Sequence, residues 1–195
     1  MNKHLYIISG CNGAGKTTAS FTILPEILNC QEFVNADEIA RGLSPFQPDK
    51  VSFEAGRIML KRIKELLHQN ETFAFETTLA TKSYKNLILT AQEQGYTVTV
   101  LFFWLQTINL AKERVKTRVI EGGHYIDDDV IERRYKNGIS NLFNIYLDVV
   151  DEALLFDNSE GIHHLMATKK INQEIKVEDA LTFNLLKKVY HEIGQ

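Results

Sequence analysis

No stretch constrains this chain more than the run near its start, Gly10-Cys11-Asn12-Gly13-Ala14-Gly15-Lys16-Thr17. It matches G-x-x-x-x-G-K-[ST], the phosphate-binding loop, at every fixed position. Glycines let backbone N–H groups curl around a phosphate, the lysine supplies positive charge, and the threonine offers a hydroxyl to Mg²⁺. An apolar run at residues 5–9 precedes the loop, and residues 16–24 have a helical pattern. This order of strand, loop and helix predicts a site for a nucleotide phosphate.

The rest of the chain alternates between strand and helix patterns. Short apolar runs typical of buried strands recur at residues 32–37, 72–76, 96–104, 153–156 and, as an edge strand, 163–167. Helical spacing of apolar residues falls between and after them, at residues 51–69, 82–94, 108–121, 127–147 and 177–193. Pro25 predicts an end or kink in the first helix, and Gly42 and Pro45 mark an irregular segment. The pattern predicts an α/β fold of the P-loop NTPase type, with a mostly parallel, doubly wound sheet between helices.

Length and composition narrow the class of protein. A chain of 195 residues can hold one full core but not two comfortable ones, so we expect a single domain over residues 1–195. The formal net charge of -3 argues against a general nucleic-acid or membrane-surface binder. Because no apolar run is long enough to span a membrane and no targeting pattern is visible, we expect a cytoplasmic protein. Cys11 and Cys30 are expected as reduced thiols, with the pKa of Cys11 lowered by the helix N-terminus.

Basic side chains gather in one later segment, about residues 107–136. Its first helix ends at Gly122-Gly123, and three aspartates at residues 127–129 suit the start of the next helix. The cationic residues of the segment are Lys112, Arg114, Lys116, Arg118, Arg133, Arg134 and Lys136. So dense a basic segment, in an acidic chain with a phosphate loop, predicts a lid that closes over phosphates rather than a solvated charged face. His124, beside the glycines, is a candidate for substrate binding or for a hinge or capping role.

Acidic residues are expected where neighbouring strands end, the edge at which ligands bind in open α/β sheets. Asp37 is the candidate general base for an acceptor hydroxyl, and Glu76 is placed to hold that acceptor. Spacing leaves alternatives open. Asp37 and Asp157 each follow an apolar run, as metal-binding aspartates do in such NTPases. Asp37 or Glu76 could instead hydrogen-bond to groups that bind Mg²⁺ directly, without contacting the metal. Lys16 would hold the donor phosphates and Thr17 the metal.

With these residues assembled, the chain resembles the zeta-toxin-like branch of P-loop kinases, a group often labelled predicted ABC-type ATPases. The matching runs are G-C-N-G-A-G-K-T-T (10–18), F-V-N-A-D-E-I-A-R-G-L-S-P (33–45), F-E-T-T-L-A (75–80), R-V-K-T-R-V-I-E-G-G-H (114–124) and I-E-R-R-Y (131–135). The resemblance implies a kinase of a small molecule that depends on ATP and Mg²⁺. Zeta toxins phosphorylate a sugar hydroxyl of UDP-N-acetylglucosamine, so a sugar nucleotide is the implied acceptor.

The resemblance also implies roles for residues on the acceptor side. The aspartate at the position of Asp37 is taken as the base in that family. The region of Glu76 and Thr77 meets the sugar nucleotide, and Arg41, in the same run as Asp37, is assigned to the substrate. Zeta toxins pair with a small helical antitoxin that blocks ATP entry, which makes such a protein a candidate partner.

On the donor side, the resemblance implies that lid arginines meet phosphates. These are Arg118 and Arg134, or Arg133 beside it. Asn158, in the turn after the strand at residues 153–156, would lie near the adenine. The implied nucleotide contacts are Gly10, Cys11, Asn12, Gly13, Ala14, Gly15, Lys16, Thr17 and Thr18.

Two other functions compete with a sugar-nucleotide kinase. One is a kinase of a nucleoside, a nucleotide or a polynucleotide end. The other is a nucleotide-dependent regulatory module with slow ATPase activity. A transporter ATPase is disfavoured because the chain has no Leu-Ser-Gly-Gly-Gln signature.

Overall fold

The computed structural model describes residues 3–123 and 125–194, and within them seven strands form one sheet in the order β2-β3-β1-β4-β5-β6-β7. The strands are β1 (Lys3–Ser9), β2 (Glu32–Val34), β3 (Phe73–Thr77), β4 (Tyr96–Trp104), β5 (Glu152–Asp157), β6 (His164–Lys170) and β7 (Lys176–Val177). The α-helices are α1 (Lys16–Thr22), α2 (Ala36–Leu43), α3 (Ser52–Gln69), α4 (Tyr84–Glu93), α5 (Ile108–Ile120), α6 (Asp128–Asn141), α7 (Leu147–Val149) and α8 (Ala180–Ile193). Strands β1 to β5 pair in parallel, and β6 and β7 are antiparallel. The predicted α/β fold with a mostly parallel sheet is confirmed.

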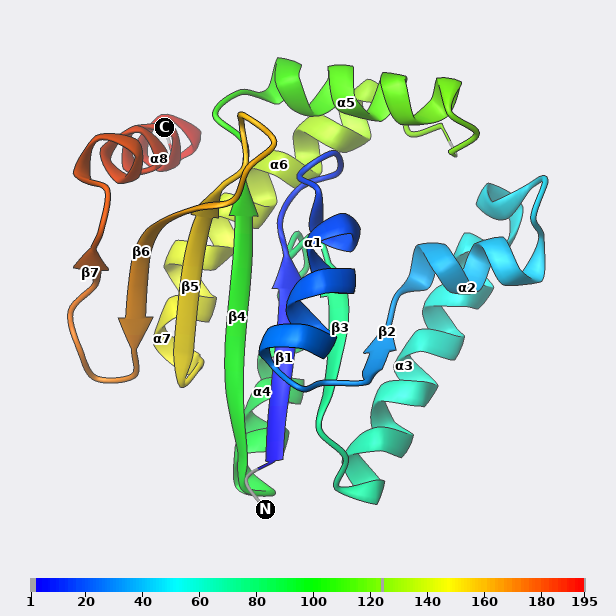
Figure 1. The fold of residues 1–195 in the computed structure, drawn as a ribbon, viewed down its shortest axis with the longest axis horizontal. Helices are drawn as coiled ribbons and strands as arrows, with labels where there is room; N and C mark the ends of the chain where they lie inside the picture. The colour runs from blue at the N-terminus through cyan, green and yellow to red at the C-terminus, as the bar shows by residue number, and fades with distance from the viewer. Residues whose placement is uncertain (1–2, 124, 195) are drawn as a thin grey trace.

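Helices lie on both faces of the sheet. In Figure 1, α1 lies in front of the central strands, while α4, α6 and α7 lie behind them. Strand β4 is buried at every position except Thr97, as its continuous apolar sequence predicts for a strand covered on both sides. The aromatics Phe102, Phe103 and Trp104 are buried core residues, as expected.

The pairing register brings the loops that follow the strands to one edge of the sheet. Ser9 at the end of β1 pairs with Thr77 of β3 and with Phe102 of β4, and Asp157 of β5 pairs with Trp104. The phosphate loop begins directly after Ser9. Gly10 has φ 137, and a Cβ there would collide with the Phe103 carbonyl oxygen, so only glycine lets the loop start here.

The structure corrects the expectation for residues 32–45. Strand β2 ends at Val34, and Asn35 caps helix α2. The expected strand continued to residue 37 and was followed by an irregular segment. The Asn35 side-chain oxygen accepts a hydrogen bond from the Asp37 backbone N–H at 2.8 Å, which starts α2. Asp37 therefore lies in the first turn of a helix instead of at a strand end.

The predicted end of the first helix near Pro25 is confirmed: α1 ends at Thr22, and a separate π-helical turn (Ile23–Ile27) carries the chain through the proline, with the Leu28 N–H bonded to the Ile23 carbonyl at 3.0 Å. Two further expectations about element boundaries are corrected. Strand β6 is not the edge, since the two-residue strand β7 pairs with its outer side. The last helix starts at residue 180 instead of 177, where Asp179 accepts hydrogen bonds from two backbone N–H groups.

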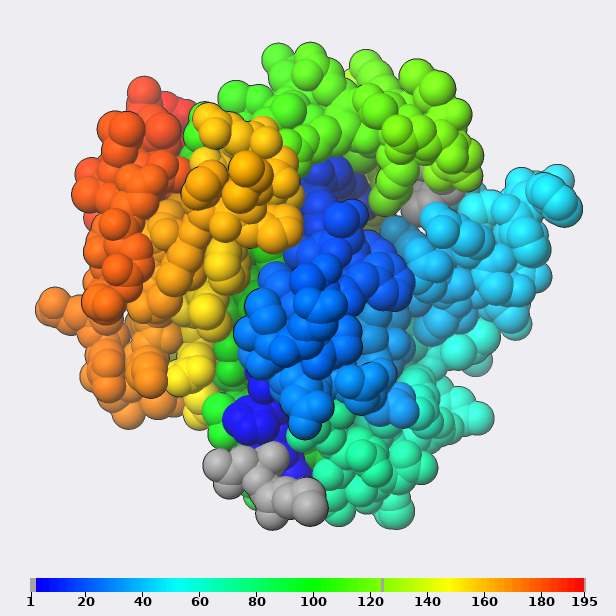
Figure 2. Space-filling view, in the orientation of Figure 1, coloured from blue at the N-terminus to red at the C-terminus, as the bar shows by residue number. Residues whose placement is uncertain are grey.

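Helices α5 and α6 cross the edge of the sheet above the phosphate loop (Figure 1), and Figure 2 shows this green segment lying over the blue loop region. Helix α6 is fastened to β4 by one phenol: Trp104 Nε1 donates to the Tyr135 hydroxyl at 3.1 Å, and that hydroxyl donates to the Leu105 carbonyl at 2.7 Å. The two helices expected in this basic segment are confirmed, and their role as a lid stays a prediction. His124 lies outside the described residues. Among the described helices, none is both long and apolar enough to cross a bilayer.

We expect Tyr135→Phe to lower the free energy of unfolding by about 1–3 kcal/mol, because it leaves a buried carbonyl and a buried indole N–H without their partner. Urea unfolding followed by the fluorescence of Trp104, the single tryptophan, measures this change. Tyr190→Phe, which removes a hydroxyl bonded to Asn144 at an exposed site, is the control and should cost less. Equal losses in the two variants would contradict the anchoring role of Tyr135.

Candidate active site

The centre of the site is a buried ion pair between the phosphate loop and β3. Lys16, the first residue of α1, approaches Glu76 Oε1 at 3.4 Å, and its Nζ also donates to the Cys11 carbonyl at 3.0 Å. The two charged side chains are only 7% and 10% exposed. Since charges are costly to bury unless they are paired and hydrogen-bonded, these contacts hold the lysine in place against the loop.

The second oxygen of Glu76 binds neutral donors. The Thr17 hydroxyl donates to Glu76 Oε2 at 2.7 Å, and Asn35 Nδ2 donates to the same oxygen at 2.9 Å. Thr17 comes from α1 and Glu76 from β3, while Asn35 lies between β2 and α2. A hydroxyl beside a carboxylate is a donor set that suits Mg²⁺, which is held by one or two protein oxygens together with phosphate oxygens and waters. Within the part of the chain that the structure describes, no cluster of three His, Cys, Asp or Glu side chains offers another metal site.

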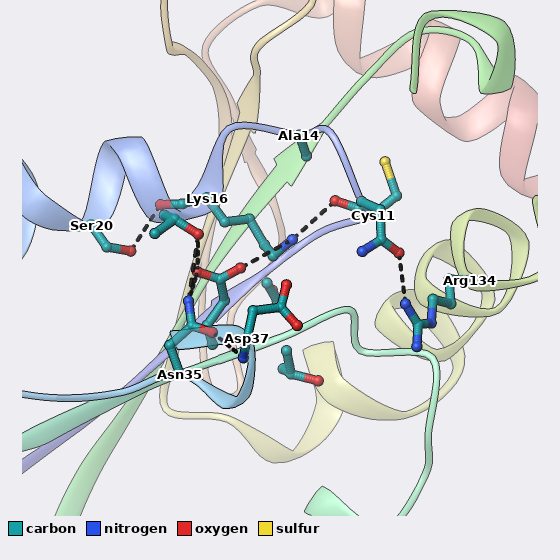
Figure 3. A network of polar contacts seen from close by, with 12 residues as sticks. Cys11, Ala14, Lys16, Ser20, Asn35, Asp37 and Arg134 are labelled. Carbon is teal, nitrogen blue, oxygen red and sulfur yellow. Dashed lines mark hydrogen bonds and ion pairs between the residues drawn. The ribbon is translucent and has the colours of Figure 1, made fainter. Parts of the chain in front are cut away.

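Asp37 and Arg134 face the same space from opposite sides. Figure 3 shows the Asp37 carboxylate directed toward the space between Lys16 and Arg134. Arg134 Nη1 donates to the Asn12 side-chain oxygen at 3.1 Å, which joins α6 to the phosphate loop. Burial lowers the pKa of Arg134, and the Asp37 carboxylate opposes that shift. Because the ordinary pKa of an arginine lies far above neutral pH, the guanidinium keeps its charge.

A cavity of about 490 Å³ opens beside these groups. It brings together six of the residues singled out in the sequence: Asn12, Lys16, Asp37, Glu76, Thr77 and Arg134. Other lining residues were missed, among them Asn35, Phe53, Arg57 and Tyr84. The Asn-Ala-Asp run was a usable cap signal, but nothing in the spacing of α3 marks its cavity-facing residues.

Helix α6 also supports the wall of this cavity that follows β3. Asn141 Nδ2 donates to the Leu79 carbonyl at 2.9 Å, and a Cβ on Gly138 would lie 2.7 Å from the Thr78 carbonyl oxygen. Leu79 itself has φ 59, a left-handed conformation that is uncommon for leucine. The contacts of α6 with Thr78 and Leu79 therefore support this turn directly after β3.

The turn after β5 contacts the other side of the phosphate loop. Asn158 Nδ2 donates to the Ala14 carbonyl at 2.8 Å, so this side chain braces the loop. Asp157 is occupied elsewhere, since its oxygens accept hydrogen bonds from Gln106 and from the Ser159 backbone. Of the three candidate carboxylates, Glu76 is the one that the described contacts join to Thr17.

Several predicted site residues lie outside the cavity. Arg133 is exposed, and Arg41 pairs with Glu38 at 3.4 Å and lines a neighbouring cavity of about 440 Å³. Thr18 is exposed on α1. Arg118 packs against Gly123 in the turn after α5, and its buried Nε and Nη2 have no hydrogen-bond partner among the described residues. Of the three predicted lid arginines, the cavity contains only Arg134.

The two cysteines are free and buried. The pKa of Cys11 is raised and not lowered, which corrects the expectation. Burial raises the pKa of the Cys11 thiol to about 11, which outweighs the opposing effects of Lys16, a backbone hydrogen bond and Arg114. Burial likewise raises the pKa of Cys30 to about 11. Desolvation of the thiolate is thus the larger effect, and neither thiol is activated.

These raised values predict a loss of stability at alkaline pH. A neutral buried thiol stabilises the folded state fully below the ordinary thiol pKa of about 8.5, and this contribution is lost as the pH rises toward 11. Relative to a Cys11→Ala/Cys30→Ala variant, the wild-type free energy of unfolding should fall by about 1.4 kcal/mol per thiol per pH unit in that window. Urea unfolding at several pH values measures the difference. A difference independent of pH would show that the thiols are not desolvated.

Solved structures of other proteins share the fold of this chain. The complex of AvrRxo1-ORF1 with AvrRxo1-ORF2 contains a chain that superposes with a TM-score of 0.74 at 16% identity, over 97% of this chain and 64% of that one. This chain thus spans just under two thirds of that protein's length. The PezAT toxin-antitoxin system of Streptococcus pneumoniae matches with a TM-score of 0.63 at 13% identity, over 100% of this chain and 88% of the other. At such identities the likeness shows the fold.

Sequence comparison adds one curated relative and a family. A protein of Haemophilus influenzae, described only as uncharacterized, is 29% identical over 126 residues, which cover 65% of this chain and 88% of the relative. The model of the Zeta toxin family matches residues 1–164 and so includes the phosphate loop, Asp37, Glu76 and both lid helices. The chain therefore belongs to the Zeta toxin family.

Proposed function

We propose that the protein is an ATP- and Mg²⁺-dependent kinase that phosphorylates a hydroxyl group of a UDP-sugar, of the UDP-N-acetylglucosamine kind. One observation carries the proposal: a candidate base, Asp37, lines the same cavity as Lys16 of the phosphate loop and Arg134 of the lid. A phosphoryl donor held by the loop and an acceptor held in the cavity would meet there, which is the positioning that phosphoryl transfer requires.

The chain's own residues have separate tasks in this reaction. Lys16 and the loop amides hold the donor phosphates, and Arg134 stabilises negative charge on the transferring group. Asp37 accepts the proton of the acceptor hydroxyl as that oxygen attacks the γ-phosphorus and ADP leaves. Thr17 and Glu76 are the residues that would hold Mg²⁺, which supplies charge neutralisation between the phosphates when it is bound.

The walls of the cavity favour an acceptor that carries negative charge and a flat ring. Arg57 on α3 lines the side away from the loop, and Phe53, one turn before it, is 82% exposed. A guanidinium binds phosphate oxygens and an exposed aromatic ring stacks on a base, so this pair suits the nucleotide part of a sugar nucleotide. Thr77 and Thr78 offer hydroxyl groups to a sugar.

A protein partner is part of the proposal. PezAT is a toxin-antitoxin system, and AvrRxo1-ORF1 was solved in complex with AvrRxo1-ORF2, in one case with ATP. By analogy, an antitoxin-like protein would bind this chain and limit access to the site. Co-expression with the product of an adjacent gene, followed by ATPase assays of the complex, tests this directly.

The activity itself is tested by incubating the purified protein with ATP, Mg²⁺ and a panel of sugar nucleotides, nucleosides, nucleotides and polynucleotide ends. Mass spectrometry should find a phosphorylated UDP-sugar. If another acceptor is phosphorylated instead, the protein is a kinase, but a UDP-sugar is not its substrate. If no acceptor accelerates ATP consumption while ATP changes the affinity for a partner protein, the protein is a nucleotide-dependent regulatory module and both kinase hypotheses are rejected.

We expect Asp37→Asn to lower kcat by about 10²- to 10⁴-fold, because the amide cannot take the proton of the acceptor hydroxyl. The affinity for ATP, measured by calorimetry, should change little, since Asp37 makes no described contact with the phosphate loop. Glu38→Gln, an adjacent and exposed carboxylate, is the matched control. Full turnover in the Asp37 variant would refute its assignment as the base.

Arg57→Ala should raise the KM for a phosphate-bearing acceptor by about tenfold or more while kcat changes less. The variant loses a charge-assisted hydrogen bond to a phosphate of the acceptor, which does not itself react. Steady-state kinetics at saturating ATP give both constants. Lys61→Ala, one turn further along α3 and outside the cavity, is the control for loss of positive charge. A KM that rises equally in both variants would point to general electrostatics instead of a specific contact.

A further inference from the structure

Asn35 lies where the donor and acceptor halves of the site meet. Its Oδ1 accepts a hydrogen bond from the Asp37 N–H at 2.8 Å, and its Nδ2 donates to Glu76 Oε2 at 2.9 Å. The same nitrogen is 3.5 Å from the Thr17 hydroxyl. The residue itself is only 6% exposed, and its partners are partly buried.

Helix capping alone does not account for this side chain. Serine, threonine or aspartate in its place would also cap α2, because each offers an oxygen to the backbone N–H of the first turn. Aspartate has no donor for Glu76, and a serine hydroxyl on a shorter side chain cannot reach Glu76 while it caps. A carboxamide provides an acceptor and a donor at fixed positions on one rigid, neutral group.

Each contact of Asn35 acts on a residue with a different task. The cap fixes the first turn of α2, which carries Asp37. The amide donor holds Glu76 Oε2 where it also meets the Thr17 hydroxyl, while Lys16 occupies the other oxygen of Glu76. One planar group thus links the residue proposed to activate the acceptor with the residues proposed to bind the donor and its metal.

We propose that Asn35 is a positioning residue that couples the phosphate loop to Asp37, so that nucleotide binding at Lys16 and Thr17 orders the first turn of α2 and aims the base. This inference rests on the proposed function for its kinetic consequence only. The coupling itself is a property of the Glu76, Asn35 and Asp37 contacts and is measurable without an acceptor.

The variants separate the two contacts of Asn35. Asn35→Ser keeps a neutral cap and loses the donor to Glu76. Asn35→Asp keeps the shape of the side chain and an oxygen for the cap, but it loses the donor and adds a negative charge. Asn35→Ala loses both contacts. Asp179→Ala removes the cap of α8, where the side chain accepts from Leu181 and Thr182, and serves as the control for the loss of a cap outside the site.

The kinetic experiment compares kcat, acceptor KM and ATP affinity across these proteins. Asn35→Ser should keep a urea midpoint close to that of the wild type and an ATP dissociation constant within about threefold, while kcat falls by about tenfold or more. Asp179→Ala should lower the urea midpoint and leave kcat unchanged. A kcat for both Asn35→Ser and Asn35→Asp within about twofold of the wild type would overturn the proposal.

Hydrogen exchange at the Asp37 amide decides the question even if no acceptor is found. A non-hydrolysable ATP analogue with Mg²⁺ should slow exchange at Asp37 in the wild type but not in Asn35→Ser, although both proteins keep the cap. Equal slowing in the two proteins would overturn the coupling. A wild type that binds ATP and phosphorylates nothing would refute the proposed function and leave the exchange result standing as the test of Asn35.

Discussion

The buried contact between Lys16 and Glu76 is the interaction on which the rest of the site depends. It exists because β1 and β3 are parallel neighbours, so that the loop after β1 and the end of β3 meet at the same edge of the sheet. Two charges can be buried together here because each has further hydrogen bonds, to the Cys11 carbonyl and to the Thr17 hydroxyl. The site is thus one connected polar network, in which removing one side chain changes the hydrogen bonding of the others.

Helix α6 organises the acceptor side in a comparable way. It contributes Arg134 to the cavity, supports the segment after β3 through Gly138 and Asn141, and is fastened to β4 by Tyr135. The helix named as part of a lid is therefore also a wall of the site. Because Arg134 donates to the Asn12 side chain, α6 is joined directly to the phosphate loop.

The sequence predicted most elements because their signals are local. Apolar runs and helical periodicity gave the strands and helices of the core, and the glycine spacing gave the phosphate loop. The errors fell where a single side chain or a short pairing decides the outcome. Asn35 begins a helix by one capping bond, and β7 exists only through its pairing with β6. For Cys11, the helix N-terminus was a local signal, whereas the burial that outweighs it is a property of the packed molecule.

The sequence by itself determined the phosphate loop, the α/β alternation, and the acidic and basic residues from which a kinase site could be built. Tertiary structure decided which of them meet. It placed Arg134 in the cavity and left Arg118 and Arg133 outside it, and it gave Glu76, instead of Asp157, to Thr17. The reason is physical: Asn35 and Glu76 are 41 residues apart, and Asn12 and Arg134 are 122 apart. Such pairs depend on strand order and helix packing, which a local pattern of hydrophobicity does not encode.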